Sequence, residues 1–242
     1  MPNPADAGAG GLGSLEPQGS LYHPAFGQTL SYRLDRVSDD PDTQVAQVTG
    51  MMANLVRLDA HDPYVLADAQ AALSDPEAHG DPLEAAFRWV KARMTFVRDE
   101  ETAEPIQAAM PVSAGEIVEV LIRPRDMSDA LRGQHGQGDC DDFTIYGAAL
   151  LRALGIPVNF VTIAADKRDP SVYSHVYLAA YPAGRGRVAM DLSHGPRVGW
   201  ESPVAYRRRE WLIDGPYHGP IAGAAWLGVM ALAAAVAAGK VH

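Results

Sequence analysis

Gly138-Asp-Cys-Asp-Asp142 contains the only cysteine among the 242 residues, and the sequence around it predicts where that cysteine lies. The glycine-rich run 132–137 before it has no hydrophobic periodicity and predicts a loop. Residues 143–154 are apolar at helical spacing, and Gly155-Ile-Pro157 after them is a typical helix end. Cys140 is therefore expected in the first turn of a buried helix. Unpaired backbone N–H groups and the helix dipole favour a thiolate there and can hold an oxyanion.

Two later segments alternate like strands and carry the partners that a reactive thiol needs. His175 lies near the start of the segment 173–181, and Asp191 ends the segment 187–191. Gly184-Arg-Gly186 between them suits a hairpin turn. Adjacent antiparallel strands can bring His175 beside Asp191, so that the carboxylate fixes the imidazole tautomer. The pattern predicts Cys140 as nucleophile, His175 as base and Asp191 as the residue that orients the base.

Four short blocks follow one another along the chain: Gly138-Asp-Cys140, Leu154-Gly-Ile-Pro157, Ser174-His-Val-Tyr177 and Met190-Asp-Leu192. In this order they resemble the transglutaminase-like cysteine peptidase family of the papain-like superfamily, in its bacterial or phage form. The segment 84–99 is similar to the helix that precedes the core of that family, and the resemblance extends over about residues 42–214. It implies an α+β fold with helices packed on an antiparallel sheet and the nucleophile at a helix N-terminus. It also implies a Cys-His-Asp triad at Cys140, His175 and Asp191.

Other residues near these motifs compete for a role. His135, in the loop before the cysteine, and His194, past the second strand, are rival bases. The resemblance to papain-like enzymes points to Gln134 as an oxyanion-hole donor, with Gln137 as its competitor. The carboxylates on either side of Cys140 are interpreted as helix caps rather than metal ligands. We therefore expect neither a metal nor a cofactor.

Composition narrows the class of protein. The formal net charge is −10, from 30 acidic and 20 basic residues, which argues against a nucleic-acid partner because phosphate binding needs a positive surface. A single cysteine excludes an internal disulfide and a zinc site built from several cysteines. An unpaired thiol suits a reducing compartment, and the amino-terminal sequence lacks the pattern of a secretory signal. These features predict a cytoplasmic catalytic body.

The remaining sequence predicts helices before the cysteine and mainly strands elsewhere. An Asp-Pro step opens a helix that ends near residue 58, Asp62 caps a second helix at 63–73, and a third is expected at 82–96. Strands are expected at 29–37 and 158–164, and 211–213 is a short apolar piece. Residues 116–122 fit either a short strand or a short helix.

We expect three parts along the chain. Residues 1–40 form a loosely ordered arm with one strand, 41–216 the transglutaminase-like catalytic domain, and 217–242 a hydrophobic segment. Residues 221–238 are apolar throughout and lie at the lower edge of the ~18–20 residues that a membrane-spanning helix needs. They are interpreted as a membrane helix or as a helix docked on the body or on an assembly partner. In the membrane case, the basic run 207–209 would keep the body on the cytoplasmic side.

These patterns favour thiol-dependent acyl transfer, most simply the hydrolysis of a peptide or amide bond in a peptide or protein substrate. Transfer of the acyl group to an amine is the other outcome of the same chemistry. The alternative is a transglutaminase-like interaction or structural module of a membrane or phage-type assembly, including a virion. The loose amino-terminal arm and the apolar carboxyl-terminal segment suit that alternative.

Overall fold

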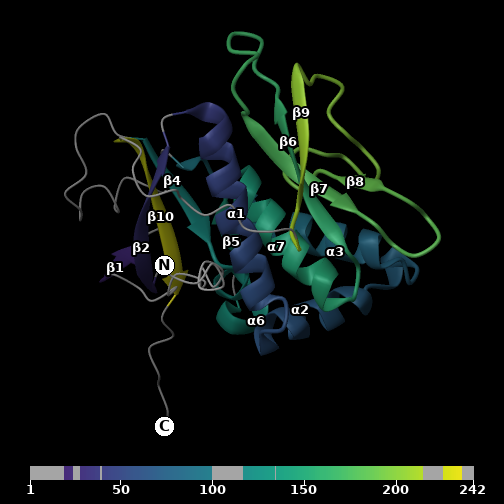
Figure 1. Cartoon of the computed structure of the whole chain (residues 1–242). Helices are drawn as coiled ribbons and strands as arrows, with labels where there is room; N and C mark the ends of the chain where they lie inside the picture. The colour runs from purple at the N-terminus through teal and green to yellow at the C-terminus, as the bar shows by residue number, and fades with distance from the viewer. Residues whose placement is uncertain are drawn as a thin grey trace, which may run out of the picture.

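Helices separate two four-stranded sheets (Figure 1). The computed structural model describes residues 19–23, 28–38, 40–99, 117–133, 135–214 and 226–235. One sheet has the strand order β1-β2-β10-β4, formed by Gly19–His23, Gln28–Ser38, Trp226–Ala235 and Ile117–Ile122. The other has the order β8-β7-β6-β9, formed by Val188–Met190, His175–Ala180, Val158–Ala164 and Arg207–Leu212. The predicted α+β class, with helices on an antiparallel sheet, is confirmed.

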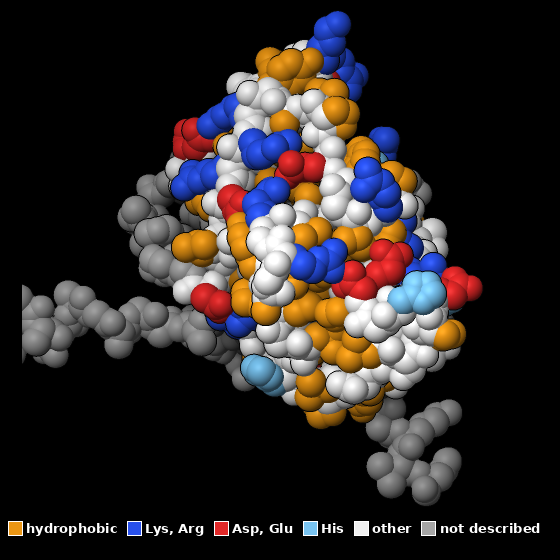
Figure 2. Space-filling model, turned by 90° about the vertical axis from the view of Figure 1, so that its right-hand side faces the viewer, with side chains coloured by type: hydrophobic (Ala, Val, Ile, Leu, Met, Phe, Trp, Pro, Cys, Tyr) orange, Lys and Arg blue, Asp and Glu red, His pale blue; other side chains and the backbone are white. Residues whose placement is uncertain are grey.

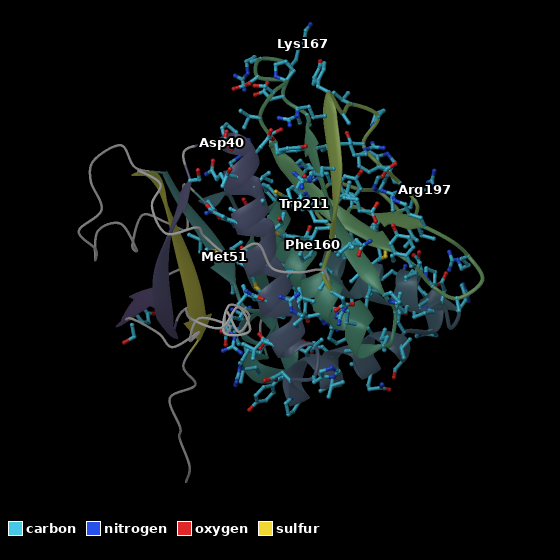
Figure 3. The ribbon with its side chains drawn as sticks, in the orientation of Figure 1. Asp40, Met51, Phe160, Lys167, Arg197 and Trp211 are labelled. Carbon is cyan, nitrogen blue, oxygen red and sulfur yellow. The ribbon has the colours of Figure 1, made fainter. Side chains whose placement is uncertain are left out.

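Aspartate followed by proline opens several of the described helices. Asp40, Asp62, Asp75 and Asp81 each accept a backbone N–H of the first turn at 2.9 Å, while the following proline takes a position that needs no N–H donor. Asp40 marks the end of α1 at which this capping occurs (Figure 3). These helices are α1 (Pro41–Asp59), α2 (Pro63–Leu73), the short 3₁₀ helix η3 (Pro76–Ala78) and α3 (Pro82–Arg93).

Helix α7 (Cys140–Ala153) packs against both α1 and the second sheet and is buried along most of its length. Gly147 faces Leu192 so closely that a Cβ there would lie 2.0 Å from Leu192 Cδ1. The absence of a side chain at Gly147 therefore leaves the space that the Leu192 side chain, just after Asp191, occupies. Residues from α1, α2, α3, β6 and β7 complete the core around it, among them Leu55, Val65, Leu83, Phe160 and Leu178.

The connection before α7 contains short elements. Helices α5 (Pro124–Met127) and α6 (Asp129–Arg132) lead into β5 (Gly136–Gly138), which pairs in parallel with β3 (Met94–Phe96). The third predicted helix is therefore wrong in its last three residues, because residues 94–96 pair with β5 instead of continuing α3. The predicted loop 132–137 likewise ends in strand β5. Residues 117–122 are a strand, which decides the alternative left open above.

The carboxyl-terminal helix is the largest error of the sequence prediction. Within the apolar run 221–238, Trp226–Ala235 form strand β10, antiparallel to β2 and parallel to β4. Both edges of β10 are thus hydrogen-bonded, so an apolar run of this kind satisfies its backbone in a sheet as well as in a helix. None of the helices among the described residues has the length and apolar character to cross a membrane. The amino-terminal part also contains two described strands, β1 and β2, where one was expected.

The basic run 207–209 on β9 is engaged in specific contacts. Arg207 pairs with Asp42 at 2.7 Å, Arg208 pairs with Glu201 at 3.1 Å, and the Arg209 guanidinium lies 3.7 Å from the Trp211 ring centroid. Trp211 and Phe160 are paired residues on the neighbouring strands β9 and β6 (Figure 3). On the face drawn in Figure 2, basic and acidic side chains are interspersed rather than gathered into one patch.

Candidate active site

Cys140 is the first residue of α7 and is half-buried. Asp139 is in an extended conformation before it and caps the helix by accepting the backbone N–H of Asp141 at 3.1 Å. The Thr144 hydroxyl donates to the Cys140 carbonyl oxygen at 2.7 Å, which fixes the first turn. The predicted position of the cysteine at a helix start is confirmed. A thiol there meets the positive end of the helix dipole.

The start of α7 is locked to the first sheet by a close approach at Gly138. A Cβ at this position would lie 2.2 Å from Oδ2 of Asp142, so only glycine leaves room for that carboxylate. Asp142 is 1% exposed, and its Oδ1 accepts the backbone N–H of Ile122, on β4, at 2.7 Å. The hydrogen bond couples the position of Cys140 to strand β4.

His175 and Asp191 are joined by a hydrogen bond of 2.8 Å between Nε2 and Oδ2. Asp191 is completely buried, and its Oδ1 accepts from the Ser193 hydroxyl at 3.2 Å and from the backbone N–H of His194 at 2.9 Å. Because an ionised carboxylate only accepts, these contacts assign the ring proton of His175 to Nε2. Nδ1 is then the ring nitrogen that can take a proton from a thiol.

The turn that carries these donors is tight. Gly195 donates its N–H to the Asp191 carbonyl at 2.9 Å, and a Cβ on Gly195 would lie 2.4 Å from that oxygen. Lys91 on α3 donates to the Ser193 carbonyl at 3.1 Å, which ties the turn to a helix. The sequence prediction missed Ser193 and the His194 amide as partners of Asp191. No sequence pattern predicts this role, because it depends on the backbone conformation of the turn.

Two opposing effects set the pKa of Asp191: burial of the carboxyl group and the groups that donate hydrogen bonds to it. Burial alone would raise the pKa of Asp191, but the hydrogen bond and charge of His175, together with the His194 amide, lower it below its ordinary value. Burial lowers the pKa of His194, and the charge of His175 lowers it further. The rings of His175 and His194 meet edge to face, with centroids 4.8 Å apart. The site therefore favours a negative Asp191 and a neutral His194.

A pocket of about 390 Å³ lies beside these residues, and both Cys140 and His175 line it. Asp191 lies behind His175, on the side of the ring away from the free nitrogen. Neither His135 nor His194 is among the described residues that line the pocket. Gln134, the predicted oxyanion-hole donor, lies outside the described residues. The structure thus brings Cys140 and His175 to one pocket and Asp191 to the histidine. Residues of α1, among them Val45 and Val48, also line the pocket, and the sequence did not predict this contribution.

Within the part of the chain that the structure describes, two groups of side chains bring metal-ligating atoms within 4.8 Å of one another. One is His175, Asp191 and His194; the other is Asp99, Asp139 and Asp142. In the first group, a hydrogen bond already joins His175 to Asp191. In the second, each carboxylate accepts a backbone N–H, from Val120, Asp141 and Ile122 respectively. Helix and strand capping accounts for these carboxylates, and the absence of a metal stays a prediction.

Comparison with solved structures gives distant similarities. The chain is similar to Rad4-Rad23 crosslinked to an undamaged DNA, with 9% identity and a TM-score of 0.35 over 68% of this chain and 42% of that one. It is also similar to a candidate cysteine protease from Cytophaga hutchinsonii, with 15% identity and a TM-score of 0.33 over 88% of this chain and 66% of that one. The chain thus spans less than two thirds of the length of either protein. No curated protein matches the sequence.

Residues 118–192 match the family model of the transglutaminase-like superfamily. The matched segment begins in β4, contains Cys140 and His175, and ends one residue after Asp191. The match supports thiol-dependent catalysis as the general class of activity. It also agrees with the mixed helix and sheet core described above. The similarity to the transglutaminase-like superfamily thus covers less than half of the chain, from β4 to the residues just after β8.

Proposed function

We propose that this protein hydrolyses a peptide or amide bond by acyl transfer through Cys140. The observation that carries the proposal is the 2.8 Å hydrogen bond from His175 Nε2 to a fully buried Asp191, beside a pocket that Cys140 and His175 both line. A carboxylate with three donors holds its histidine in one tautomer, and that tautomer leaves Nδ1 for the thiol.

In the first half of the reaction, His175 Nδ1 takes the proton of the Cys140 thiol. The sulfur then forms a bond to the substrate carbonyl carbon, and the C=O π electrons move onto oxygen. When the tetrahedral intermediate collapses, the C–N bond breaks, and His175 returns the proton to the leaving amine. The product is a thioester on Cys140 and a free amine. Asp191 stays negative and stabilises the imidazolium that forms between the two transfers.

In the second half, water attacks the thioester and gives its proton to His175 Nδ1. The C–S bond breaks, the carboxylic acid leaves, and the proton returns to the sulfur. An amine in place of water would give transamidation by the same steps. We favour water because it needs no binding site for a second substrate.

Both the dipole of helix α7 and His175 can activate the Cys140 thiol as a nucleophile. The dipole at the start of α7 stabilises charge on the sulfur, whereas the nearby carboxylates of Asp139 and Asp141 oppose it. Because these effects act against one another, we expect proton transfer to His175 to supply most of the nucleophilicity. Removing His175 should then cost more than removing either neighbouring carboxylate.

The test uses the fact that Cys140 is the only thiol in the chain. We expect iodoacetamide to alkylate the protein near neutral pH faster than it alkylates a model thiol, and His175→Ala to remove that advantage. Cys140→Ala should lower hydrolysis of a peptide library by at least about 10³-fold. The matched control is His135→Ala, an exposed histidine next to the site, which should leave both rates within about twofold.

Two results would count against the proposal. One is a Cys140 that reacts no faster than the model thiol. The other is hydrolysis that persists in a folded Cys140→Ala protein. An unreactive thiol would favour the alternative, a transglutaminase-like module that acts by binding rather than by catalysis.

A further inference from the structure

We propose that the pocket beside Cys140 binds one large apolar side chain of the substrate, next to the carbonyl that the cysteine attacks, and that α1 sets this preference. The inference rests on the proposed function, because it assigns a substrate class to the same site. It is argued from the walls of the pocket, which come from α1, the start of α7 and the chain leading into β7.

The α1 wall carries an apolar stripe, although Gln44 and Thr49 of the same helix also line the pocket. Val45, Val48 and Met52 line it at spacings of three and four residues, which place them on one face of the helix. Val45 and Val48 are only half-buried, although other residues of the same helix, Leu55 and Val56, are at most 1% exposed in the core. The stripe is therefore incompletely covered by the protein itself.

The opposite wall is also apolar at its rim. Val172 is 36% exposed and lines the pocket together with Tyr173 and the buried Val176. Cys140 and His175 lie on the same lining. A volume of about 390 Å³ is near the lower end of the roughly 300–1,000 Å³ typical of ligand pockets. The space suits one bulky side chain with the adjacent backbone, and it does not suit a longer segment.

The charges around the pocket select against an acidic residue. Asp139 and Asp141 line it, and none of its described lining residues is lysine or arginine. A carboxylate entering this space would lose water and meet like charge, with no lysine or arginine on the described lining to pair with it. An apolar side chain would lose only its contact with water, which favours binding.

Arg207 holds the two walls at a fixed separation. One guanidinium nitrogen donates to the Asp42 carboxylate on α1 at 2.7 Å, and the other donates to the Ser171 carbonyl at 2.7 Å. The same group lies 4.8 Å from the ring centroid of Tyr173. Because the pairs are partly exposed, each stabilises the fold little, but together they fix the width of the pocket. Arg207 thus links α1 to the chain leading into β7.

The experiment compares two thiol-alkylating probes, acetyl-leucyl and acetyl-aspartyl chloromethyl ketone, with iodoacetamide as a probe too small to need the pocket. In each chloromethyl ketone reaction the Cys140 thiolate forms the S–C bond as chloride leaves. We expect the leucyl probe to react at least about tenfold faster than the aspartyl probe. Val48→Trp, which fills the pocket, should lower the leucyl rate by about tenfold and leave the iodoacetamide rate within about twofold.

The matched control is Leu58→Trp, a substitution on the same helix at a position that is 46% exposed and is not part of the pocket lining. It should leave all three rates unchanged. If Val48→Trp does not fold, Val172→Trp at the exposed rim replaces it, with the same expected loss of the leucyl rate. Circular dichroism establishes that each variant is folded before rates are compared.

The outcomes separate the two proposals. Slow iodoacetamide labelling of the wild-type protein would overturn the proposed function. Fast iodoacetamide labelling with equal leucyl and aspartyl rates would leave that function standing and overturn the apolar pocket. Equal effects of Val48→Trp and Leu58→Trp on the leucyl rate would also overturn it.

Discussion

At the scale of single residues, Asp191 is the side chain on which the candidate site depends most. It is fully buried, a position that penalises an isolated carboxylate heavily. Three donors offset that penalty, from the His175 ring, the Ser193 hydroxyl and the His194 amide. Their combined effect on the charged form exceeds that of burial, so the pKa of Asp191 is lowered. A buried carboxylate that stays ionised is what a histidine base needs as its partner.

This balance predicts how stability changes with pH. The pKa of Asp191 is lower in the folded chain than the value of about 3.9 expected in the unfolded chain. The stabilisation from this carboxylate is therefore complete above about pH 5 and is lost as the pH falls through the folded pKa. Asp191→Asn removes this contribution, so the difference between the wild-type and variant urea midpoints should shrink as the pH is lowered from about 6 to 3.

Asp169→Asn serves as the control for that titration. Asp169 is an exposed carboxylate on the connection between β6 and β7, and its replacement should change the free energy of unfolding by no more than about 0.5 kcal/mol. At neutral pH, Asp191→Asn should cost about 1–3 kcal/mol, because asparagine has one acceptor oxygen: if that oxygen keeps the Ser193 and His194 donors, the NH₂ group faces His175 Nε2–H and cannot accept from it. Midpoints of the wild type and Asp191→Asn that fall in parallel over the whole pH range would contradict the prediction.

Residue-scale prediction from sequence succeeds where the signal is local. The capping aspartate before Cys140 and the glycine after the helix both lie within a few residues of the ends they define, so the helix start was predictable. The pairing of His175 with Asp191 follows from the antiparallel register of β7 and β8, in which Leu178 pairs with Met190. Extending that register makes His175 and Asp191 diagonal neighbours. The donors of the turn after Asp191 depend on its backbone shape, which no short pattern encodes.

At the scale of elements, a buried carboxylate on α2 organises the approach to the nucleophile. Asp68 is 2% exposed and accepts the backbone N–H groups of Asp129 and Ala130 at 2.9 and 3.0 Å. It also accepts from the hydroxyls of Ser128 and Tyr146. It therefore caps α6 from a different helix, and α6 leads directly into β5 and Cys140. Burial, followed by the charge of Asp68 and the hydrogen bond to it, raises the pKa of Tyr146, so its hydroxyl stays a donor.

We predict that Asp68→Ala lowers the free energy of unfolding by about 3 kcal/mol or more, because it leaves several buried donors without an acceptor. Urea denaturation measures this loss. The alkylation rate of Cys140 should fall as well, since the turn that Asp68 holds leads to the nucleophile.

Tyr146→Phe is the matched comparison, since it removes one donor to the same carboxylate, at 2.7 Å, together with the acceptor of the Trp89 indole N–H. We expect it to cost about 1 kcal/mol, a clearly smaller loss than that of Asp68→Ala. Equal losses for the two variants would show that packing around Tyr146, rather than the capping of α6, determines the stability of this region.

Element prediction from sequence was accurate for the helices that begin with aspartate and proline, because capping and proline geometry are local. It failed at the end of α3. There, residues 94–96 leave the helix to pair with β5, more than 40 residues away in the sequence. A helical pattern cannot report a partner at that distance. The same limit explains why the sequence did not predict that α1 lines the pocket. Val48 and His175 are far apart in the sequence and come to one pocket only in the folded chain.

At the scale of the whole molecule, the first sheet joins distant parts of the sequence around one strand. β10 lies between β2 and β4, so it connects residues near the amino terminus with the strand that precedes α5. From β4, the Ile122 N–H reaches Asp142 on α7, two residues after the cysteine. The second sheet, which carries His175, does not include β10. The base thus lies on the second sheet, whereas the helix of the nucleophile is tied to the first sheet through Asp142 and also packs against β7 of the second.

This arrangement predicts which parts of the fold respond when β10 is broken. Ala231 pairs with Leu34 on one side and with Val120 on the other, at the centre of the sheet. Ala231→Pro removes a backbone donor and fixes φ in a strand that has neighbours on both edges, a position that proline does not tolerate. We expect faster hydrogen–deuterium exchange in β2 and β4, and unchanged protection in β6 and β7.

The rate of Cys140 alkylation should change in the same variant, because β4 positions α7 through Asp142. The hydrogen bond between His175 and Asp191 should persist, because both residues lie in the part of the fold built on the second sheet. Lys167→Pro, at the exposed tip of the connection between β6 and β7 (Figure 3), is the control for a proline outside either sheet and should leave exchange in β2 and β4 as in the wild type. If Ala231→Pro leaves β2 and β4 fully protected, strand β10 does not hold the sheet together. The apolar carboxyl-terminal segment would then have to be explained by an interaction outside this fold.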